Sequence, residues 1–271
     1  LQHGLAEQAF AARIHAALSQ AGTIGVGYNS IRFDDEFTRF LFWRNLIDPY
    51  GREWQDGCGR WDLLDVMRLA HALRPDGIHW PQHENGTTSF RLEHLSAANG
   101  LQHDSAHDAL SDVRATLALA RLLKTVQPKL FDFALALHKK DRVAQELGLP
   151  VTQHHAQPFL HVSGMLPAQH GFMAVMWPLA SHPVNRNEII AWDLRHDPQE
   201  LADLSATEIR QRLFTKSDDL PEGVRRLPIK GIHLNRSPMV VRNLHVLTHQ
   251  QAQRWQIDLD QARHHAETAR G

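Results

Sequence analysis

An amphipathic segment near the middle of the chain, residues 101–128 (LQHDSAHDALSDVRATLALARLLKTVQP), constrains the fold more than any other stretch. From Ser105 onward its apolar residues recur at three- and four-residue spacing, which predicts one long helix with a single buried face. Pro128 ends this helix. The residues expected on its buried face are Ala109, Val113, Thr116, Leu117, Ala120 and Leu123.

The start of this helix carries two chemically useful groups, His107 and Asp112. Ser105, followed three residues later by Asp108, resembles a capping box and places the helix start here. An imidazole takes up a proton near neutral pH, and a carboxylate binds hard cations. Most such groups at helix starts are caps or solvated side chains, so the assignment of a function needs a second motif.

That second motif is GVGYNSIRFDDEFT, residues 25–38. Residues 23–28 predict a short buried strand, which Asn29 and Ser30 interrupt, and a helix is expected to begin near Asp34. Three consecutive acids suit a helix N-terminus through the macrodipole, so capping alone explains them. An acid beyond the carboxyl end of a strand is also where open α/β sheets place their chemistry.

The remaining pattern divides the chain into a helix-rich and a strand-rich part. Helices are predicted near residues 5–19, 34–46, 61–73, 90–98 and 129–147, and residues 48–60 form a loop. In the second helix, Phe37, Phe40 and Leu41 are expected to face the core. Short strands are predicted at residues 159–165, 172–179, 188–194, 229–234 and 238–241, with helices at 206–214 and 248–268.

These stretches together resemble the DEDDh exonucleases, which have a ribonuclease H-like fold. The segments GYNSIRFDDEFTR, GRWDLLDV, SFRLEHLSAANG and HDALSDV, followed by HVSGM, HPVNRN and HLNRSP, are similar to the bacterial exonuclease I family. This family consists of single-strand-specific 3′→5′ exodeoxyribonucleases. The resemblance implies an α/β fold, with a ribonuclease H-like exonuclease domain over residues 1–127. A small β-rich Src-homology-3-like barrel domain, with its leading helix, is expected over residues 128–271.

The same resemblance implies metal-assisted hydrolysis of single-stranded DNA to 5′-mononucleotides, in DNA repair and recombination. Two Mg²⁺ ions, with Mn²⁺ as the alternative, would lie about 3.5–4 Å apart. Carboxylates suit both metals. His107 would be the general base, Asp112 a catalytic metal ligand, and Asp34 the acid that completes the catalytic cluster.

The chain departs from the family pattern at its first motif. An Asp-x-Glu is expected several tens of residues before Asp34 and is absent, as is the C-terminal helical domain of the family. We therefore expect an internal fragment with a truncated exonuclease domain that lacks part of the metal site and is inactive by itself.

The resemblance also implies contacts with the DNA strand, by Arg39, Tyr50, Trp54, Arg68 and Arg91. Tyr50 and Trp54 lie in the polar loop 48–60. Aromatic residues in a loop are often lids on a core, but they also stack on single-stranded bases, at about 1–3 kcal/mol per base. For most of the arginines, an ordinary surface role is the alternative.

Composition agrees with a globular protein, with 42% apolar and 22% charged residues in 271. No apolar run has the length of a membrane span, and no signal peptide is visible. The single cysteine, Cys58, excludes internal disulfides and is compatible with the bacterial cytoplasm. With a net charge of −1, the chain as a whole does not attract DNA, so any contact with DNA has to come from local basic patches. We expect a monomer, with single-strand DNA-binding protein as a partner by family resemblance.

Three other functions were weighed. Residues 103–107 nearly fit the zinc-protease pattern, but Asp replaces the Glu that acts as its general base. The His-Asp doublets there also suggest a metal-dependent phosphohydrolase. Neither explains residues 25–38. A non-catalytic module that binds single-stranded DNA remains open, and an upstream Asp-x-Glu would distinguish the enzyme from it.

Overall fold

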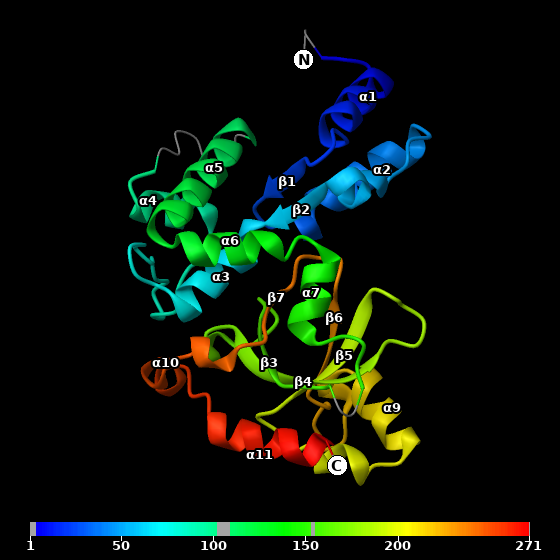
Figure 1. Cartoon of the computed structure of the whole chain (residues 1–271), viewed down its shortest axis with the longest axis vertical. Coiled ribbons are helices and arrows are strands. Elements are labelled where there is room, and N and C mark those ends of the chain that lie inside the picture. The colour runs from blue at the N-terminus through cyan, green and yellow to red at the C-terminus, as the bar shows by residue number, and fades with distance from the viewer. Residues whose placement is uncertain (1–3, 102–108, 153–154, 271) are drawn as a thin grey trace. The chain divides into compact units, whose positions relative to one another are not determined.

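The structure is a computed structural model that describes residues 4–101, 109–152 and 155–270. It divides into two compact units (Figure 1). Unit 1 comprises residues up to Lys140 together with Asn235–Ser237, and unit 2 comprises Asp141–Leu234 and the chain from Pro238.

Unit 1 is built from helices around a two-stranded parallel sheet. Strand β1 (Ile24–Gly27) pairs with β2 (Gly59–Asp62), so that Gly27 lies opposite Asp62. Parallel strands need a crossover between them, and helix α2 (Asp34–Arg44) lies within it. The other helices of this unit are α1 (Glu7–Leu18), α3 (Leu63–Leu73), α4 (Leu92–Ala98), α5 (Ala109–Val126) and α6 (Pro128–Ala136), and short 3₁₀ turns occupy Ser30–Arg32, Gly51–Glu53 and Gln55–Gly57.

The core of unit 1 gathers around Trp61 of β2, which is almost fully buried. Its indole Nε1 donates a hydrogen bond of 3.0 Å to the carbonyl of Ala134 in α6. Phe131 of the same helix packs edge-on against the indole ring, with 5.2 Å between centroids. Helix α6, which the sequence analysis grouped with the second domain, therefore packs within unit 1.

Most predicted elements of unit 1 are confirmed, but β2 was not predicted. Residues 59–62 were assigned to a loop and to the start of a helix, whereas they form a fully buried strand. The segment Gly59-Arg60-Trp61-Asp62 carries two charged residues in four, so it lacks the apolar run typical of a buried strand. The charges are tolerated because their side chains find partners inside the unit, as described below.

The predicted buried face of α2 is wrong. Phe37 and Phe40 are 64% and 66% exposed, Leu41 is half-buried, and Phe42 is fully buried. Aromatic and aliphatic residues occur on several sides of this helix, so periodicity alone does not choose its inner face.

The predicted buried face of α5 is wrong in part, since Ala109, Val113 and Leu117 are exposed, whereas Thr116 and Leu123 are buried as expected. The buried stripe is spaced by four residues and includes small side chains, which allow close helix packing: Ser111, Ala115, Leu119 and Leu123. The expected capping box, Ser105 with Asp108, lies outside the described residues.

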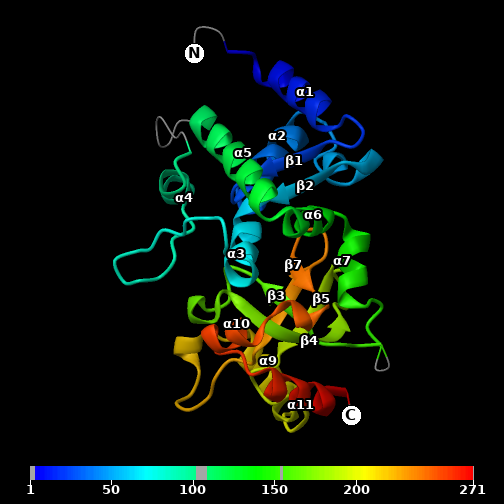
Figure 2. The same cartoon turned by 60° about the vertical axis from the view of Figure 1, so that its left-hand side comes forward.

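Unit 2 contains an antiparallel five-stranded sheet in the order β6-β5-β4-β3-β7. All five predicted strands are confirmed, and neighbouring strands lie side by side in both views (Figures 1 and 2). The elements are α7 (Lys140–Leu147), β3 (Phe159–Val162), β4 (Met173–Ser181), β5 (Glu188–Asp193), α8 (Gln199–Ala202), α9 (Ala206–Phe214), β6 (Ile229–His233), β7 (Met239–Val241), α10 (His249–Arg254) and α11 (Leu259–Arg270).

The sheet of unit 2 encloses an apolar core and is covered by its C-terminal helix. Phe159, Leu160 and Trp192 are fully buried on the strands. Helix α11 contacts the sheet through His265, whose Nδ1 lies 2.8 Å from the carbonyl oxygen of Leu194. This sheet with its covering helices is the small β-rich domain expected from the sequence. In the part of the chain that the structure describes, no helix has both the length and the apolar character of a membrane span.

The two aromatic residues Phe40 and Phe42 provide a test of how α2 packs. Phe42→Ala removes a fully buried ring and should lower the free energy of unfolding by about 3–5 kcal/mol. Phe40→Ala removes an exposed ring from the same helix and should change it by no more than about 0.5 kcal/mol. Chemical denaturation of both variants measures the difference. Equal destabilisation would contradict the packing of α2.

Candidate active site

The candidate site is built on the sharp turn that follows β1. Gly27 ends the strand, and a Cβ atom at this position would lie 2.3 Å from Cβ of Ser30, so only glycine fits. Asn29 adopts a left-handed conformation with φ of 60°, which asparagine tolerates better than most residues. A 3₁₀ turn over Ser30–Arg32 then leads into α2, whose first residue is Asp34.

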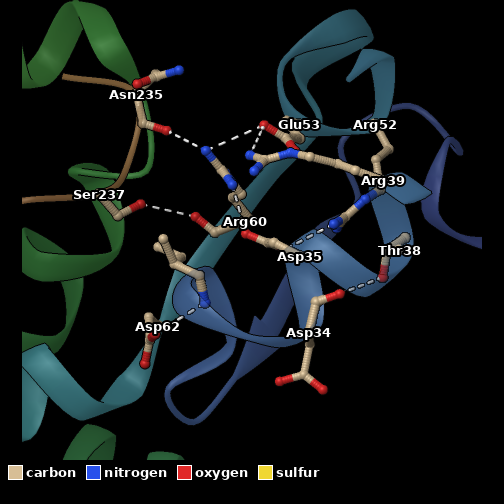
Figure 3. A network of polar contacts seen from close by, with 11 residues as sticks. Asp34, Asp35, Thr38, Arg39, Arg52, Glu53, Arg60, Asp62, Asn235 and Ser237 are labelled. Carbon is tan, nitrogen blue, oxygen red and sulfur yellow. Dashed lines mark hydrogen bonds and ion pairs between the residues drawn. The ribbon is translucent and has the colours of Figure 1, made fainter. Parts of the chain in front are cut away.

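The Asp34 carboxylate points away from the neighbouring charged side chains (Figure 3). Its backbone carbonyl accepts a hydrogen bond of 2.8 Å from Oγ1 of Thr38, but no cationic side chain among the described residues pairs with its carboxylate. The residue is exposed, yet the surrounding protein desolvates the carboxylate and raises its pKa, and the charge of Asp35 adds to this effect. A carboxylate in this position is available to a cation from outside the chain.

Asp35 has the opposite environment, since it is buried between two arginines. Its Oδ1 accepts a hydrogen bond of 2.7 Å from Arg52, and its Oδ2 accepts one of 2.6 Å from Arg60. All three side chains are at most 6% exposed. Glu53 extends the network with ion pairs of 3.2 Å to Arg60 and 2.7 Å to Arg39. This Asp35 network (Asp35, Arg39, Arg52, Glu53 and Arg60) ties α2 to β2 and to the turn at Gly51–Glu53 (Figure 3).

Arg60 also meets a segment that is distant in sequence. Its Nη2 donates a hydrogen bond of 2.9 Å to the carbonyl of Asn235, and Oγ of Ser237 donates one of 2.8 Å to the carbonyl of Arg60. Burial lowers the pKa of Arg60, and the charges of Glu53 and Asp35 oppose that effect. The guanidinium therefore keeps its charge inside the unit by having acceptors on several sides.

Asp62, at the end of β2, is a third carboxylate near the turn. It caps helix α3 by accepting a hydrogen bond of 3.0 Å from the backbone N–H of Leu64. The same side chain accepts backbone N–H groups from Asn29 at 2.8 Å and Ile31 at 3.2 Å. Burial raises its pKa, and these three hydrogen bonds oppose the shift.

The Asp35 network and Asp62 are not predicted from sequence patterns. Asp35 was attributed to helix capping, whereas no side chain caps α2 and Asp35 forms buried ion pairs instead. One signal was available, because Arg60 and Asp62 flank the apolar Trp61 in a strand, and charged residues are rarely buried without partners.

The other predicted catalytic residues lie on or before α5. Asp112 is half-buried in the first turn of that helix. His107 lies outside the described residues. Within residues 4–101, 109–152 and 155–270, no group of three or more His, Cys, Asp or Glu side chains is placed to hold a metal ion. The grouping of Asp34, His107 and Asp112 therefore stays a prediction.

The two aromatic residues expected to contact DNA are exposed, Tyr50 by 55% and Trp54 by 67%. Neither is a lid on the core. Arg39 forms two hydrogen bonds with Glu53, of 2.7 and 3.0 Å, and its guanidinium lies 5.3 Å from the centre of the Tyr50 ring. Arg39 therefore packs against the ring that is predicted, from the family resemblance, to contact DNA.

The remaining two predicted DNA contacts differ in their surroundings. Arg68 pairs with Asp65 and lies 5.7 Å from the centre of the Phe90 ring. Arg91 is exposed at the start of α4. These five contacts to DNA remain predictions.

Comparisons with known proteins identify both parts of the chain. Residues 2–120 match the family Exonuclease, and residues 138–271 match the family Exonuclease I SH3-like domain. Exodeoxyribonuclease I of Escherichia coli K12 is 46% identical over 236 residues, which are 87% of this chain and 49% of that protein. The chain belongs to the exonuclease I family.

Further relatives agree with this assignment. Exodeoxyribonuclease I of Haemophilus influenzae is 45% identical over 88% of this chain and 50% of its own length. The crystal structure of E. coli Exonuclease I with a dA16 oligonucleotide matches with a TM-score of 0.90 and 43% identity, covering 98% of this chain and 56% of that one. A moderately thermophilic Exonuclease I from Methylocaldum szegediense has a TM-score of 0.91, 48% identity and the same coverage. The chain spans about half the length of the curated relatives it matches.

Exonucleases of the DEDDh type need a divalent metal, and one solved E. coli ExoI–ssDNA complex is a zinc-bound form. The residues of this chain fit such an ion in chemical type. Asp34 and Asp112 are oxygen donors, and Asp34 is not neutralised by a described cation. These two carboxylates suit a site to which His107 and further acids contribute, but they are not a complete site by themselves.

The buried position of Asp35 leads to a stability prediction. Asp35→Asn leaves Arg52 and Arg60 without their shared carboxylate and should lower the free energy of unfolding by about 3–5 kcal/mol. The matched control is Glu7→Gln, which breaks an ion pair with Arg44 whose side chains are 50% and 58% exposed. This control should unfold like the wild type in a urea titration. A similar loss of stability in both variants would show that burial of the Asp35 network is unimportant.

Proposed function

We propose that this chain is part of a 3′→5′ exodeoxyribonuclease that degrades single-stranded DNA to 5′-mononucleotides in DNA repair and recombination. The observation that carries the proposal is the position of Asp34, at the start of the helix that follows a parallel strand and its turn, with no cationic partner among the residues that the structure describes. In the exonuclease I family, this motif supplies an acid of the metal site. The relatives solved with DNA oligonucleotides support single-stranded DNA as the substrate.

The chemistry follows from the residues. Asp34 and Asp112 would hold divalent ions, which we infer to be Mg²⁺ because carboxylate oxygens are its preferred protein ligands. When bound, such ions would supply positive charge to stabilise the scissile phosphodiester as it reacts. His107 removes a proton from the attacking water, since an imidazole titrates near neutral pH.

The strand would be held by stacking and by charge. Tyr50 and Trp54 offer exposed ring faces to bases, and a ring face stacks on any base without regard to sequence. Arg39, Arg68 and Arg91 supply positive charge for phosphates, although Arg39 and Arg68 also pair with acids of the chain. The protein has almost no net charge, so this local arrangement has to provide the attraction.

Two further parts of the proposal rest on likeness to relatives and on composition. The ExoI/SSB-Ct complex supports single-strand DNA-binding protein as a partner. One buried cysteine, Cys58, agrees with a reducing bacterial cytoplasm.

The catalytic assignment is tested in a protein that carries this chain together with an upstream Asp-x-Glu. His107→Ala and Asp112→Ala should each lower kcat on single-stranded DNA by about 10²–10⁴-fold, because one removes the base and the other a metal ligand. Binding of DNA should be nearly unchanged. Asp132→Ala, which removes an exposed carboxylate on α6, is the control. Near-wild-type turnover of either variant would reject the assignment, and a wild-type protein that binds but never cuts would favour a binding module.

The stacking role of the loop 48–60 is tested by Trp54→Ala. The variant should bind single-stranded DNA more weakly by about 1–3 kcal/mol, with little change in Tm, since the side chain is 67% exposed. Trp43→Ala is the matched control, because this residue is 69% exposed on α2 and has no predicted contact with DNA. Fluorescence anisotropy with a labelled oligonucleotide and a thermal melt measure both quantities. A large drop in Tm with unchanged affinity would show that Trp54 serves packing.

A further inference from the structure

Asp62 joins two segments that are separate in sequence. Its Oδ1 accepts backbone N–H groups from Asn29 at 2.8 Å and from Leu64 at 3.0 Å, and its Oδ2 accepts that of Ile31 at 3.2 Å. The residue is 9% exposed. Both oxygens are therefore occupied by N–H donors, and one carboxylate connects the start of α3 with the turn after β1.

The turn held by Asp62 leads directly into Asp34. Asn29 and Ile31 precede Asp34 by five and three residues; Asn29 is the N-cap of the 3₁₀ turn Ser30–Arg32, and Ile31 lies within that turn. Helix α2 has no side-chain cap of its own, because its N-cap residue is Phe33. Its first turn therefore depends on the preceding segment for its position. Asp62 holds this segment at Asn29 and Ile31, and Tyr28 holds its start by donating a hydrogen bond to the carbonyl of Phe90.

The Asp35 network fixes the rotation of the same helix. Consecutive helical residues point about 100° apart around the axis. Because Asp35 is held inward by Arg52 and Arg60, Asp34 must point in another direction (Figure 3). Two separate sets of contacts therefore position the start of α2. The hydrogen bonds to Asp62 fix the turn that precedes the helix, and the ion pairs of Asp35 fix the rotation of the helix about its axis.

We propose that Asp62 is a positioning residue for Asp34. We assign it no metal ion, because it is 9% exposed and three backbone N–H groups already use three of the roughly four acceptor sites of its carboxylate. The proposal rests on the function proposed above, in which Asp34 holds a divalent ion. Residues that orient metal ligands in this way change metal affinity or activity about 10–100-fold when they are mutated.

Two substitutions separate the role in the turn from the role as a helix cap. Asp62→Ser keeps a good N-cap for Leu64, because serine and aspartate are similarly favoured at this position. Its single hydroxyl oxygen cannot also serve Asn29 and Ile31 as the two carboxylate oxygens do. Asp62→Ala removes both functions.

The first measurement is amide hydrogen exchange in peptides covering residues 28–36 and 63–73. In Asp62→Ser the first peptide should exchange faster, and the second should stay as protected as in the wild type. In Asp62→Ala both should exchange faster. If residues 28–36 keep wild-type protection in both variants, Asp62 does not hold the turn and the proposal is wrong.

The second measurement is the affinity for Mn²⁺, followed by electron paramagnetic resonance of the free ion. Asp62→Ser should weaken Mn²⁺ binding about tenfold or more, although its α3 cap is intact. A purely structural role predicts wild-type affinity for this variant and a loss in Asp62→Ala alone. Asp34→Asn shows whether Asp34 takes part in Mn²⁺ binding. If Asp34→Asn weakens Mn²⁺ binding but Asp62→Ser binds Mn²⁺ like the wild type, the proposal is wrong.

The variant Asp34→Asn keeps the two proposals apart. If it binds Mn²⁺ like the wild type, Asp34 is not a metal ligand and the proposed function fails at that residue. The exchange measurement then still decides whether Asp62 sets the position of Asp34, because it needs neither metal nor activity.

Discussion

The ion pair between Arg60 and Asp35 is the interaction on which unit 1 depends. Both side chains are almost fully removed from water, where an unpaired charge costs several kcal/mol. Additional partners offset this cost, since Arg60 also forms an ion pair with Glu53 and a hydrogen bond with the carbonyl of Asn235. The ion pair with Asp35 also constrains the orientation of α2. A buried pair between α2 and β2 allows one helix rotation, and that rotation decides where Asp34 points.

The parallel pairing of β1 with β2 explains why the acids gather at one place. The two strands end side by side, with Gly27 opposite Asp62, so the turn after β1 lies next to the start of α3. Carboxyl ends of parallel strands are where α/β proteins place their chemistry. Here the same edge also supplies a support, because the carboxylate at the end of one strand binds the turn that leaves the other.

Sequence patterns predicted elements well where one physical requirement dominates. Alternation and turn residues located all five strands of unit 2, and strand-breaking Asn29 located the turn before α2. They failed where several requirements compete. Apolar residues surround α2, so whether Phe40 or Phe42 faces inward depends on what the helix packs against. The candidate site was predicted from family motifs in the sequence, whereas the network beside it depends on long-range contacts such as Arg60 with Asn235, which no local pattern specifies.

Three carboxylates near this turn have different chemistry because their surroundings differ. Asp35 is buried and paired with two guanidinium groups, and Asp62 is buried and accepts three backbone N–H groups, so both carboxylates are already engaged inside the protein. Asp34 has neither kind of partner among the described residues. Availability for a metal ion is therefore a property of the environment rather than of the residue type. In this turn, the two acids that protein donors already engage are those that we infer to hold Asp34 in place.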